Sequence, residues 1–261
     1  MDKNWKERTE LLLGKDNSDA LLDKHVLIIG LGGVGSYAAE AIVRAGIGEV
    51  TIVDGDTVDP TNRNRQLQAL ATTHGQSKAL LMKERMLQIN PEAKINAIDT
   101  FMNPDDMERI LQQKFDYVID AIDSVSPKMY LLKTALENGH NIVSSMGAGG
   151  KMDPTKLKVV DISKTHTCPL ASLIRKRLRG IGIKHGIKAV FSPELPARHS
   201  LMHTDGSNFK KSAYGTVSYL PAVFGLTCAS VVIRELAGWK NITAEDNARK
   251  RDPFERAKKS E

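Results

Sequence analysis

The chain has 261 residues, of which 41% are hydrophobic and 26% charged, and its formal net charge is +6. This balance excludes wholesale disorder, and the length predicts one large domain or one domain with an extension. The excess of basic residues is compatible with a polyanionic partner but does not require one.

The first predicted strand covers residues 26–29 and leads into the glycine-rich turn GLGGVG at residues 30–35. A short apolar run of this kind is typical of a strand buried on both faces of a parallel sheet. Glycines at the first, third and sixth positions of the turn permit a tight bend, close approach of phosphate and close packing of the next helix. That helix is predicted from about Val34 to Ala45, with its unsatisfied N–H groups facing the phosphates. The glycines expected to contact the nucleotide are Gly32, Gly33 and Gly35.

A second strand is predicted over residues 50–53, and it ends at Asp54. A carboxylate at this distance from Gly30 can accept hydrogen bonds from both ribose hydroxyls. Strand, turn, helix, second strand and acidic residue together supply the context that a glycine pattern alone lacks. We therefore predict a nucleotide-binding site.

The loop after Asp54 indicates which nucleotide is bound. A helix terminus can satisfy the two bridging phosphates of a dinucleotide, whereas a triphosphate normally needs cationic side chains and a metal. Asn62, Arg65 and Gln66 follow the ribose carboxylate closely, and Lys78 lies on a helix predicted over residues 75–89. These residues favour ATP.

A strand predicted over residues 117–121 places two more carboxylates, Asp120 and Asp123, at the same sheet edge. Asp123 could hold Mg²⁺, which takes few protein carboxylates and several phosphate oxygens. For Asp120 an alternative is a carboxylate that caps a nearby turn. The full set predicts ATP with Mg²⁺.

Strand and helix patterns continue to alternate along the chain. Further strands are predicted at residues 94–98 and 141–144, and helices begin at Asn103 and Ser126, the second ending at Glu137. Asn103 is a good helix cap, and it is followed by a proline and two carboxylates that favour the first turn. The alternation predicts a Rossmann-like α/β fold, a mainly parallel sheet with helices on both faces, plus a smaller C-terminal extension.

Two segments of the C-terminal part have a less certain purpose. Residues 175–179, RKRLR, form a basic run that suits either phosphate contacts or a solvated helix face. Residues 192–213 show no clear period, and we expect a mobile substrate loop there. We assign residues 166–239 to a C-terminal part of the first domain, carrying this basic segment and loop, and residues 240–261 to a charged tail.

No segment predicts an integral membrane protein. Residues 1–10 are charged and lack the apolar core of a secretory signal, which favours a cytoplasmic location. The longest apolar stretch, residues 219–233, is shorter than the roughly 20 residues of a bilayer span. We expect it to be a buried core helix.

The motifs described above resemble the ubiquitin-activating-enzyme-like superfamily, over roughly residues 5–165. Its bacterial members adenylate carboxylates, so the resemblance makes residues 1–165 an ATP-binding adenylation core and implies a homodimer. In this family the position of Asp54 holds the ribose, and the position of Asp123 works with the metal. The phosphates are held at the positions of Asn62, Arg65 and Lys78, while Asp56 and Gln66 complete the motif. Arg8 resembles an arginine that reaches the ATP of the partner subunit.

The glycine-rich segment at residues 145–155 and the segment at residues 120–128 resemble the tRNA-modifying branch, which includes threonylcarbamoyladenosine dehydratases. That branch uses ATP to close a ring on threonylcarbamoyladenosine next to the anticodon. The resemblance implies tRNA, through its anticodon arm, as a partner. A sulfur-relay protein and a monovalent cation stay open as further partners.

The chain has only two cysteines, Cys168 and Cys228, and no C-x-x-C motif, so the zinc site of many carrier-activating relatives is missing. Both cysteines are expected to pack in the core, although Cys168 lies where relatives can carry a nucleophile. An activated carboxylate tethered to its own ureido group needs no covalent relay, because tethering supplies effective molarities of about 10⁵ M or more. Two alternatives remain: adenylation of the C-terminus of a sulfur-carrier protein, and a nicotinamide-dependent dehydrogenase or dinucleotide sensor.

Overall fold

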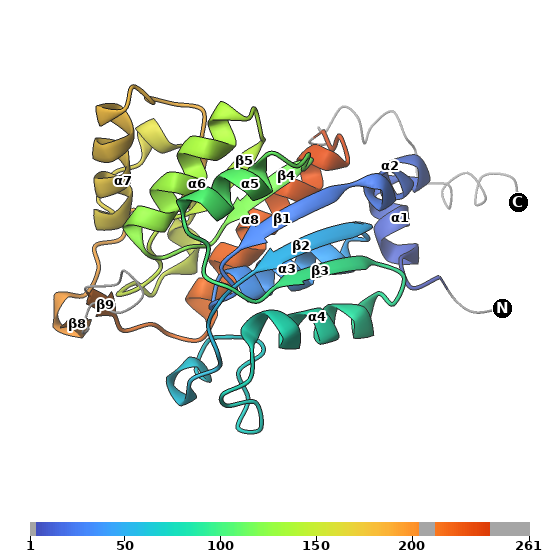
Figure 1. Ribbon diagram of the computed structural model, residues 1–261, viewed down its shortest axis with the longest axis horizontal. Helices are drawn as coiled ribbons and strands as arrows, with labels where there is room; N and C mark the ends of the chain where they lie inside the picture. The colour runs from blue at the N-terminus through green and yellow to red at the C-terminus, as the bar shows by residue number, and fades with distance from the viewer. Residues whose placement is uncertain (1–3, 204–211, 241–261) are drawn as a thin grey trace, which may run out of the picture.

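The computed structural model describes residues 4–203 and 212–240, and its centre is a seven-stranded sheet (Figure 1). The strand order is β3-β2-β1-β4-β5-β7-β6, and only the edge strand β6 runs antiparallel. The strands are β1 (His25–Ile29), β2 (Glu49–Val53), β3 (Lys94–Ile98), β4 (Tyr117–Asp120), β5 (Ile142–Ser145), β6 (Lys158–Asp161) and β7 (Lys188–Phe191). The predicted α/β fold with a mainly parallel sheet is confirmed.

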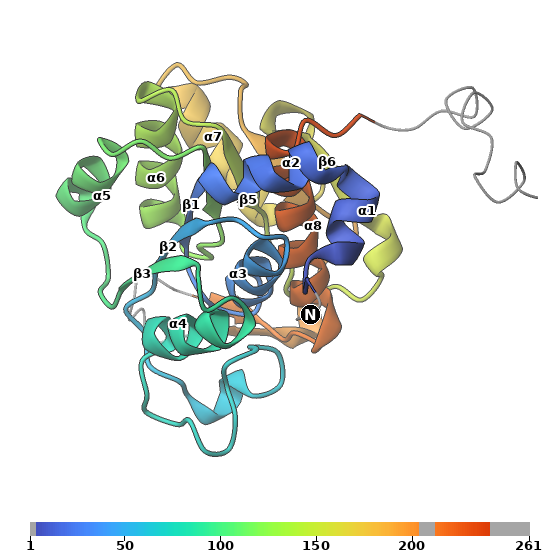
Figure 2. The ribbon, with the colours of Figure 1, turned by 90° about the vertical axis from the view of Figure 1, so that its right-hand side faces the viewer.

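Helices cover both faces of the sheet (Figure 2). One face carries α3 (Gly35–Arg44), α4 (Lys78–Ile89) and α8 (Tyr219–Leu236). The other carries α5 (Pro104–Leu111), α6 (Val125–Glu137) and α7 (Pro169–Gly180). Because α8 shares its core with strands β1 and β2, the C-terminal part of the chain packs with the N-terminal part around the same sheet.

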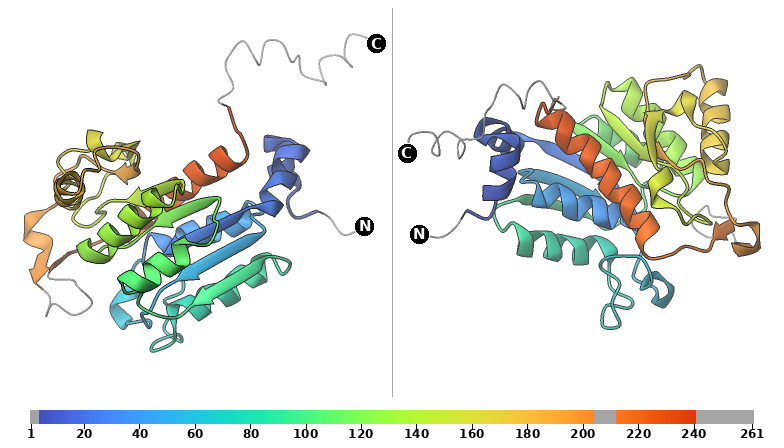
Figure 3. Two further views of the ribbon diagram at one scale, coloured as in Figure 1. Left: turned by 45° about the horizontal axis from the view of Figure 1, so that its top comes forward. Right: turned by 180° about the vertical axis from the view of Figure 1, so that it is seen from behind.

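A pair of short helices and a two-stranded hairpin lie at opposite ends of the sheet (Figures 1 and 3). The helices α1 (Glu7–Leu13) and α2 (Lys15–Ala20) lie where the parallel strands begin. The hairpin of β8 (Leu201–His203) and β9 (Ser212–Tyr214) lies where the parallel strands end. Beside the hairpin, backbone hydrogen bonds join Gly150 to Gly215 and Ala197.

The local sequence explains where the helices begin. Asn103 and Asp106 form the expected capping box of α5, with Pro104 in its first turn. The predicted helix over residues 75–89 begins later, at Lys78, because the Ser77 side chain accepts a hydrogen bond from the backbone N–H of Leu80 and caps the helix there.

The long apolar stretch is a core helix, as predicted. Helix α8 is long and apolar enough to cross a membrane by length and composition, but half of its residues are buried inside the protein. Nine of them are buried, and Phe224, Cys228 and Val232 have no exposed surface. The helix therefore packs in the core of this fold.

The expectation for residues 192–213 is partly corrected. We expect a mobile substrate loop without a clear period there, but β8 lies within the segment and β9 begins at its end, at Ser212. The mobility of the segment stays a prediction. Three residues per strand are too few to show a clear alternation in the sequence. Residues 204–211, and nearly all of the predicted charged tail at residues 240–261, lie outside the described residues.

Candidate nucleotide-binding site

The candidate site lies where the strand order reverses, at the carboxyl ends of β1, β2 and β4. The glycine turn between β1 and α3 bends sharply there. Gly30 has a φ of +90°, which residues with a side chain rarely adopt. A Cβ added at Gly35 would lie 1.7 Å from the carbonyl oxygen of Gly30. This close packing places the N-terminus of α3 beside the end of β1, where its N–H groups can face an anion.

Asp54 follows β2 directly and holds the turn in place. Its carboxylate accepts hydrogen bonds from the backbone N–H groups of Leu31, at 2.6 Å, and Asp56, at 2.8 Å. Burial raises the pKa of the Asp54 carboxyl, while the charge of Lys78 and the two N–H groups act in the opposite direction. Each oxygen keeps a lone pair beyond these bonds, so the carboxylate can still accept from ribose hydroxyls.

Two cations approach the turn from the following loop and helix. Lys78, the first residue of α4, is buried, and its Nζ lies 3.0 Å from the Asp56 carboxylate. Arg65 donates to the carbonyl oxygen of Thr61 at 3.0 Å and to the side chain of Asn64 at 2.8 Å. Both side chains are thus held in place by the protein before a ligand arrives.

Asp123, in the exposed loop after β4, lies close enough to Arg65 to influence it. Burial lowers the pKa of the Arg65 guanidinium, and the negative charges of Asp123 and Asp59 oppose that shift. The structure therefore brings together residues more than 50 positions apart in the sequence, as the strand order predicted. Within the described residues, no three His, Cys, Asp or Glu side chains are grouped so as to hold a metal. The Asp123 carboxylate is of the kind that Mg²⁺ takes together with phosphate oxygens.

Asn62 and Gln66 are both buried beside the turn. The Asn62 amide oxygen accepts a hydrogen bond from the backbone N–H of Asp59 at 3.1 Å, which leaves its amide nitrogen to donate elsewhere. The Gln66 Oε1 atom is buried without a hydrogen-bond partner among the described residues. A Cβ on Gly32 would lie 3.8 Å from Gln66 Nε2. Because a buried acceptor normally has a donor, Gln66 is an exception that the contacts within the described residues do not explain.

Arg8 lies away from this site, whereas Cys168 packs beside the glycine-rich loop and interacts with Lys151. Arg8 is exposed on α1, at the opposite end of the sheet from Asp54, so it does not reach the nucleotide site of its own chain (Figure 1). Cys168 is buried and precedes α7, where its Sγ would lie 3.7 Å from a Cβ on Gly147. Cys228 is buried in α8, so both thiols pack in the core as expected.

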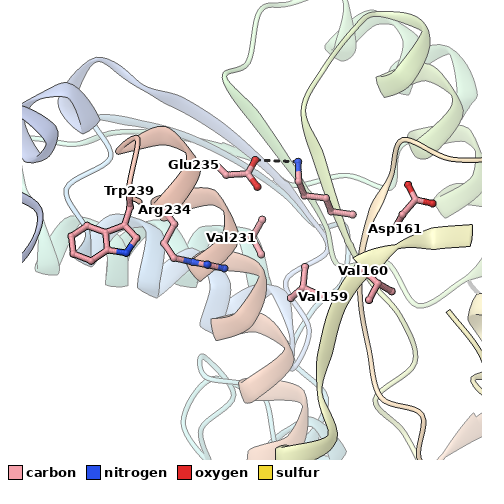
Figure 4. Close-up of a pocket in the computed structure, with 8 residues that line it drawn as sticks. Val159, Val160, Asp161, Val231, Arg234, Glu235 and Trp239 are labelled. Atoms are coloured by element: carbon pink, nitrogen blue, oxygen red, sulfur yellow. Dashed lines mark ion pairs between the residues drawn. The ribbon is translucent and has the colours of Figure 1, made fainter. Parts of the chain in front are cut away.

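A cavity of about 330 Å³ lies apart from the predicted residues, between the edge strand β6 and the end of α8 (Figure 4). Two of its charged groups already contact each other: Lys188 Nζ lies 3.1 Å from the Glu235 carboxylate, which also accepts a hydrogen bond from Tyr117. Lys188 is the first residue of β7, so this cavity lies at the end of the sheet opposite the glycine turn.

Sequence reasoning missed the roles of two buried lysines near the site, Lys128 and Lys151. Lys151 Nζ donates to the carbonyl oxygens of Gly147, at 2.8 Å, and Ser192, at 3.0 Å, and burial lowers its pKa. The only signal in the sequence is that Lys151 directly follows two glycines, Gly149 and Gly150. Lys128 pairs with Asp120. Asp120 also accepts a hydrogen bond from the backbone N–H of Ile122, so the alternative of a turn cap is confirmed.

The fold and this site define a nucleotide-binding α/β protein. The chain belongs to the ThiF family, whose family model matches residues 7–260. It is 41% identical to the tRNA threonylcarbamoyladenosine dehydratase of Bacillus subtilis over 236 residues, 88% of this chain and 93% of that protein. It is also similar to the solved structure of the Escherichia coli tRNA N6-threonylcarbamoyladenosine dehydratase in complex with ATP. That comparison has a TM-score of 0.80 and 37% identity, and covers 90% of this chain and 95% of that one. The comparison with the AMP complex of the same enzyme has a TM-score of 0.81 and covers 90% of this chain and 96% of that one. The resemblance inferred from the motifs is confirmed.

Proposed function

We propose that this protein uses ATP and Mg²⁺ to close a ring on threonylcarbamoyladenosine next to the anticodon of tRNA. The observation that carries the proposal is similarity across most of both chains to dehydratases, one of them solved with ATP. The glycine turn, Asp54 and the cations at the switch point supply a matching site in this chain. The names of the homologous enzymes give tRNA as what they act on. We infer the same substrate for this chain from its similarity to them.

In the proposed reaction the threonyl carboxylate attacks the α-phosphorus of ATP, and pyrophosphate leaves. The tethered ureido group then attacks the activated carbonyl carbon and loses a proton, and AMP leaves. Asp54 holds the ribose, while Asn62, Arg65 and Lys78 hold the phosphates. Asp123 would bind Mg²⁺, which neutralises phosphate charge when present. The protein's main contributions are alignment and exclusion of water.

The proposal is tested by incubating the protein with modified tRNA and ATP and digesting the tRNA to nucleosides. Mass spectrometry is expected to show loss of one water from the modified nucleoside, with one AMP and one pyrophosphate formed per ring. A reaction without ATP and one with tRNA lacking the modification are the controls. Unchanged nucleoside with protein that binds ATP would contradict the substrate assignment.

The basic face of α7 supports tRNA as the partner. Lys176, Arg177 and Arg179 are exposed, α7 contains no acidic residue, and these three make no ion pair among the described residues. Unpaired cations on one helix suit a phosphate backbone. We therefore assign tRNA contact to residues 166–239 and ATP binding to residues 1–165.

Replacing Lys176, Arg177 and Arg179 together with alanine is expected to raise the KM for tRNA and leave ATP affinity unchanged. The slope of log affinity against log salt should become shallower by about 2–3, because each lost phosphate contact removes roughly 0.9. Filter binding at several salt concentrations measures the slope. The matched control replaces three lysines that already pair with carboxylates: Lys15, Lys94 and Lys133. Equal slopes in both triple variants would contradict the assignment.

We further propose that the protein is a cytoplasmic homodimer in which Arg8 contacts the ATP of the partner subunit. The exposed position of Arg8, far from its own nucleotide site, supports this role.

A further inference from the structure

A fully buried polar network lies beneath the loop that carries Asp123. Asp120, at the end of β4, and Lys128, in α6, have no exposed surface. Lys128 Nζ donates to the Asp120 carboxylate, to Ser144 Oγ at 3.3 Å and to the carbonyl oxygen of Ser145 at 3.0 Å. Ser144 Oγ in turn donates to Asp120 at 2.5 Å. The network therefore joins the ends of two neighbouring strands, β4 and β5.

Stability alone does not explain this arrangement. Removing two charges from water costs several kcal/mol per ion, and apolar residues of similar volume are often as stabilising as a buried ion pair or more so. What the pair adds is a fixed geometry, because each polar atom accepts only certain positions of its neighbours.

The network fixes the beginnings of two loops. On the β4 side, Asp120 Oδ1 accepts a hydrogen bond from the backbone N–H of Ile122 at 3.0 Å, in the loop that leads to Asp123. On the β5 side, Lys128 holds the carbonyl oxygen of Ser145, directly before the glycine-rich loop at residues 146–150. The second loop is fastened at its far end by Lys151. The first loop carries Asp123 to the carboxyl ends of the strands, and the second leads toward the hairpin and α7.

We propose that Lys128 is a positioning residue that sets the distance between the Asp123 loop and the loop at residues 146–150, and so aligns the substrate carboxylate with ATP. The role in catalysis rests on the proposed function, whereas the effect on the two loops does not. Alignment errors of about 1 Å can cost about 100-fold in rate, which makes a rigid tie between these loops valuable.

The test uses the double variant Asp120→Asn/Lys128→Met, because Lys128→Met alone would leave a buried carboxylate uncompensated. Asparagine at position 120 can still accept the hydrogen bond from Ile122, so the variant keeps the start of the Asp123 loop and removes the bonds of Lys128 to Asp120, Ser144 and Ser145. At saturating ATP and tRNA, single-turnover ring closure should fall about 100-fold, with ATP affinity by calorimetry unchanged. Hydrogen–deuterium exchange should accelerate at residues 121–125 and 146–150.

The matched control is Lys133→Met on the same helix, where the lysine is half-exposed and pairs with Glu137. It should alter neither rate nor exchange. A folded double variant with wild-type ring closure and unchanged exchange would overturn the proposal. If the double variant does not fold, Asp120→Asn/Lys128→Gln decides, because the two amides can still bond each other while the shorter glutamine no longer reaches the carbonyl oxygen of Ser145. This variant should lower the single-turnover rate and accelerate exchange in the same segments, and wild-type values for both would equally overturn the proposal.

The outcomes also separate this inference from the proposed function. If the wild-type protein does not close the ring, the substrate assignment fails, and the exchange measurements with ATP alone still decide whether Lys128 positions the two loops.

Discussion

Replacing Arg65 with alanine is expected to lower kcat/KM for ATP about 10³-fold, roughly 4 kcal/mol of transition-state stabilisation, with the fold retained. The guanidinium is held by Thr61 and Asn64 beside the glycine turn and lies near Asp123. It is thus placed to neutralise charge that develops on the phosphates. Lys78→Met should have a comparable effect, because the buried ammonium group lies next to Asp56 at the start of α4.

Pyrophosphate release measures the loss, and circular dichroism checks the fold. Arg63→Ala is the matched control, since Arg63 lies in the same loop and is exposed. Normal turnover in both Arg65→Ala and Lys78→Met would remove the phosphate roles assigned to these residues.

The second large effect is expected from a pair of glycine substitutions in the same turn. Gly35→Ala should destabilise the protein by about 3 kcal/mol or more, because the new methyl group would lie 1.7 Å from a backbone oxygen. Gly32→Ala should leave the fold intact, because its methyl group would meet only the Gln66 side chain, at 3.8 Å. It should nevertheless weaken ATP binding at least about tenfold, since this glycine lets phosphate approach the backbone.

Thermal unfolding and calorimetry distinguish the two variants. The expected pattern is an unstable Gly35→Ala protein and a stable Gly32→Ala protein with weak ATP affinity. A Gly32→Ala protein that binds ATP as tightly as the wild type would place the phosphates elsewhere.

The sheet and its central site could be predicted because their signals are local. Residues 26–54 contain two buried strands, a glycine turn and an acidic residue at a fixed distance. Each of these features is predicted from short-range periodicity or from backbone sterics. The order of strands then brings Asp123 to the same edge, since the carboxyl ends of parallel strands meet there.

The buried lysines could not be predicted from periodicity or spacing. Lys128 lies in a helix whose other inward residues, Leu131, Leu132 and Ala135, are apolar, and lysine in such a pattern normally faces solvent. Only the approach of α6 to the ends of β4 and β5 pairs it with Asp120. The same holds for Lys151, whose two carbonyl partners are 45 residues apart and meet only in the folded chain.

The burial of both thiols has a practical consequence. Cys168 and Cys228 are 1% and 0% exposed, and burial raises the pKa of Cys228 to about 12. An alkylating reagent needs an accessible thiolate, so neither sulfur should react while the chain keeps its native packing. The rate of alkylation under native conditions would therefore report how often the interior opens, and the chain carries this built-in probe without any engineered label.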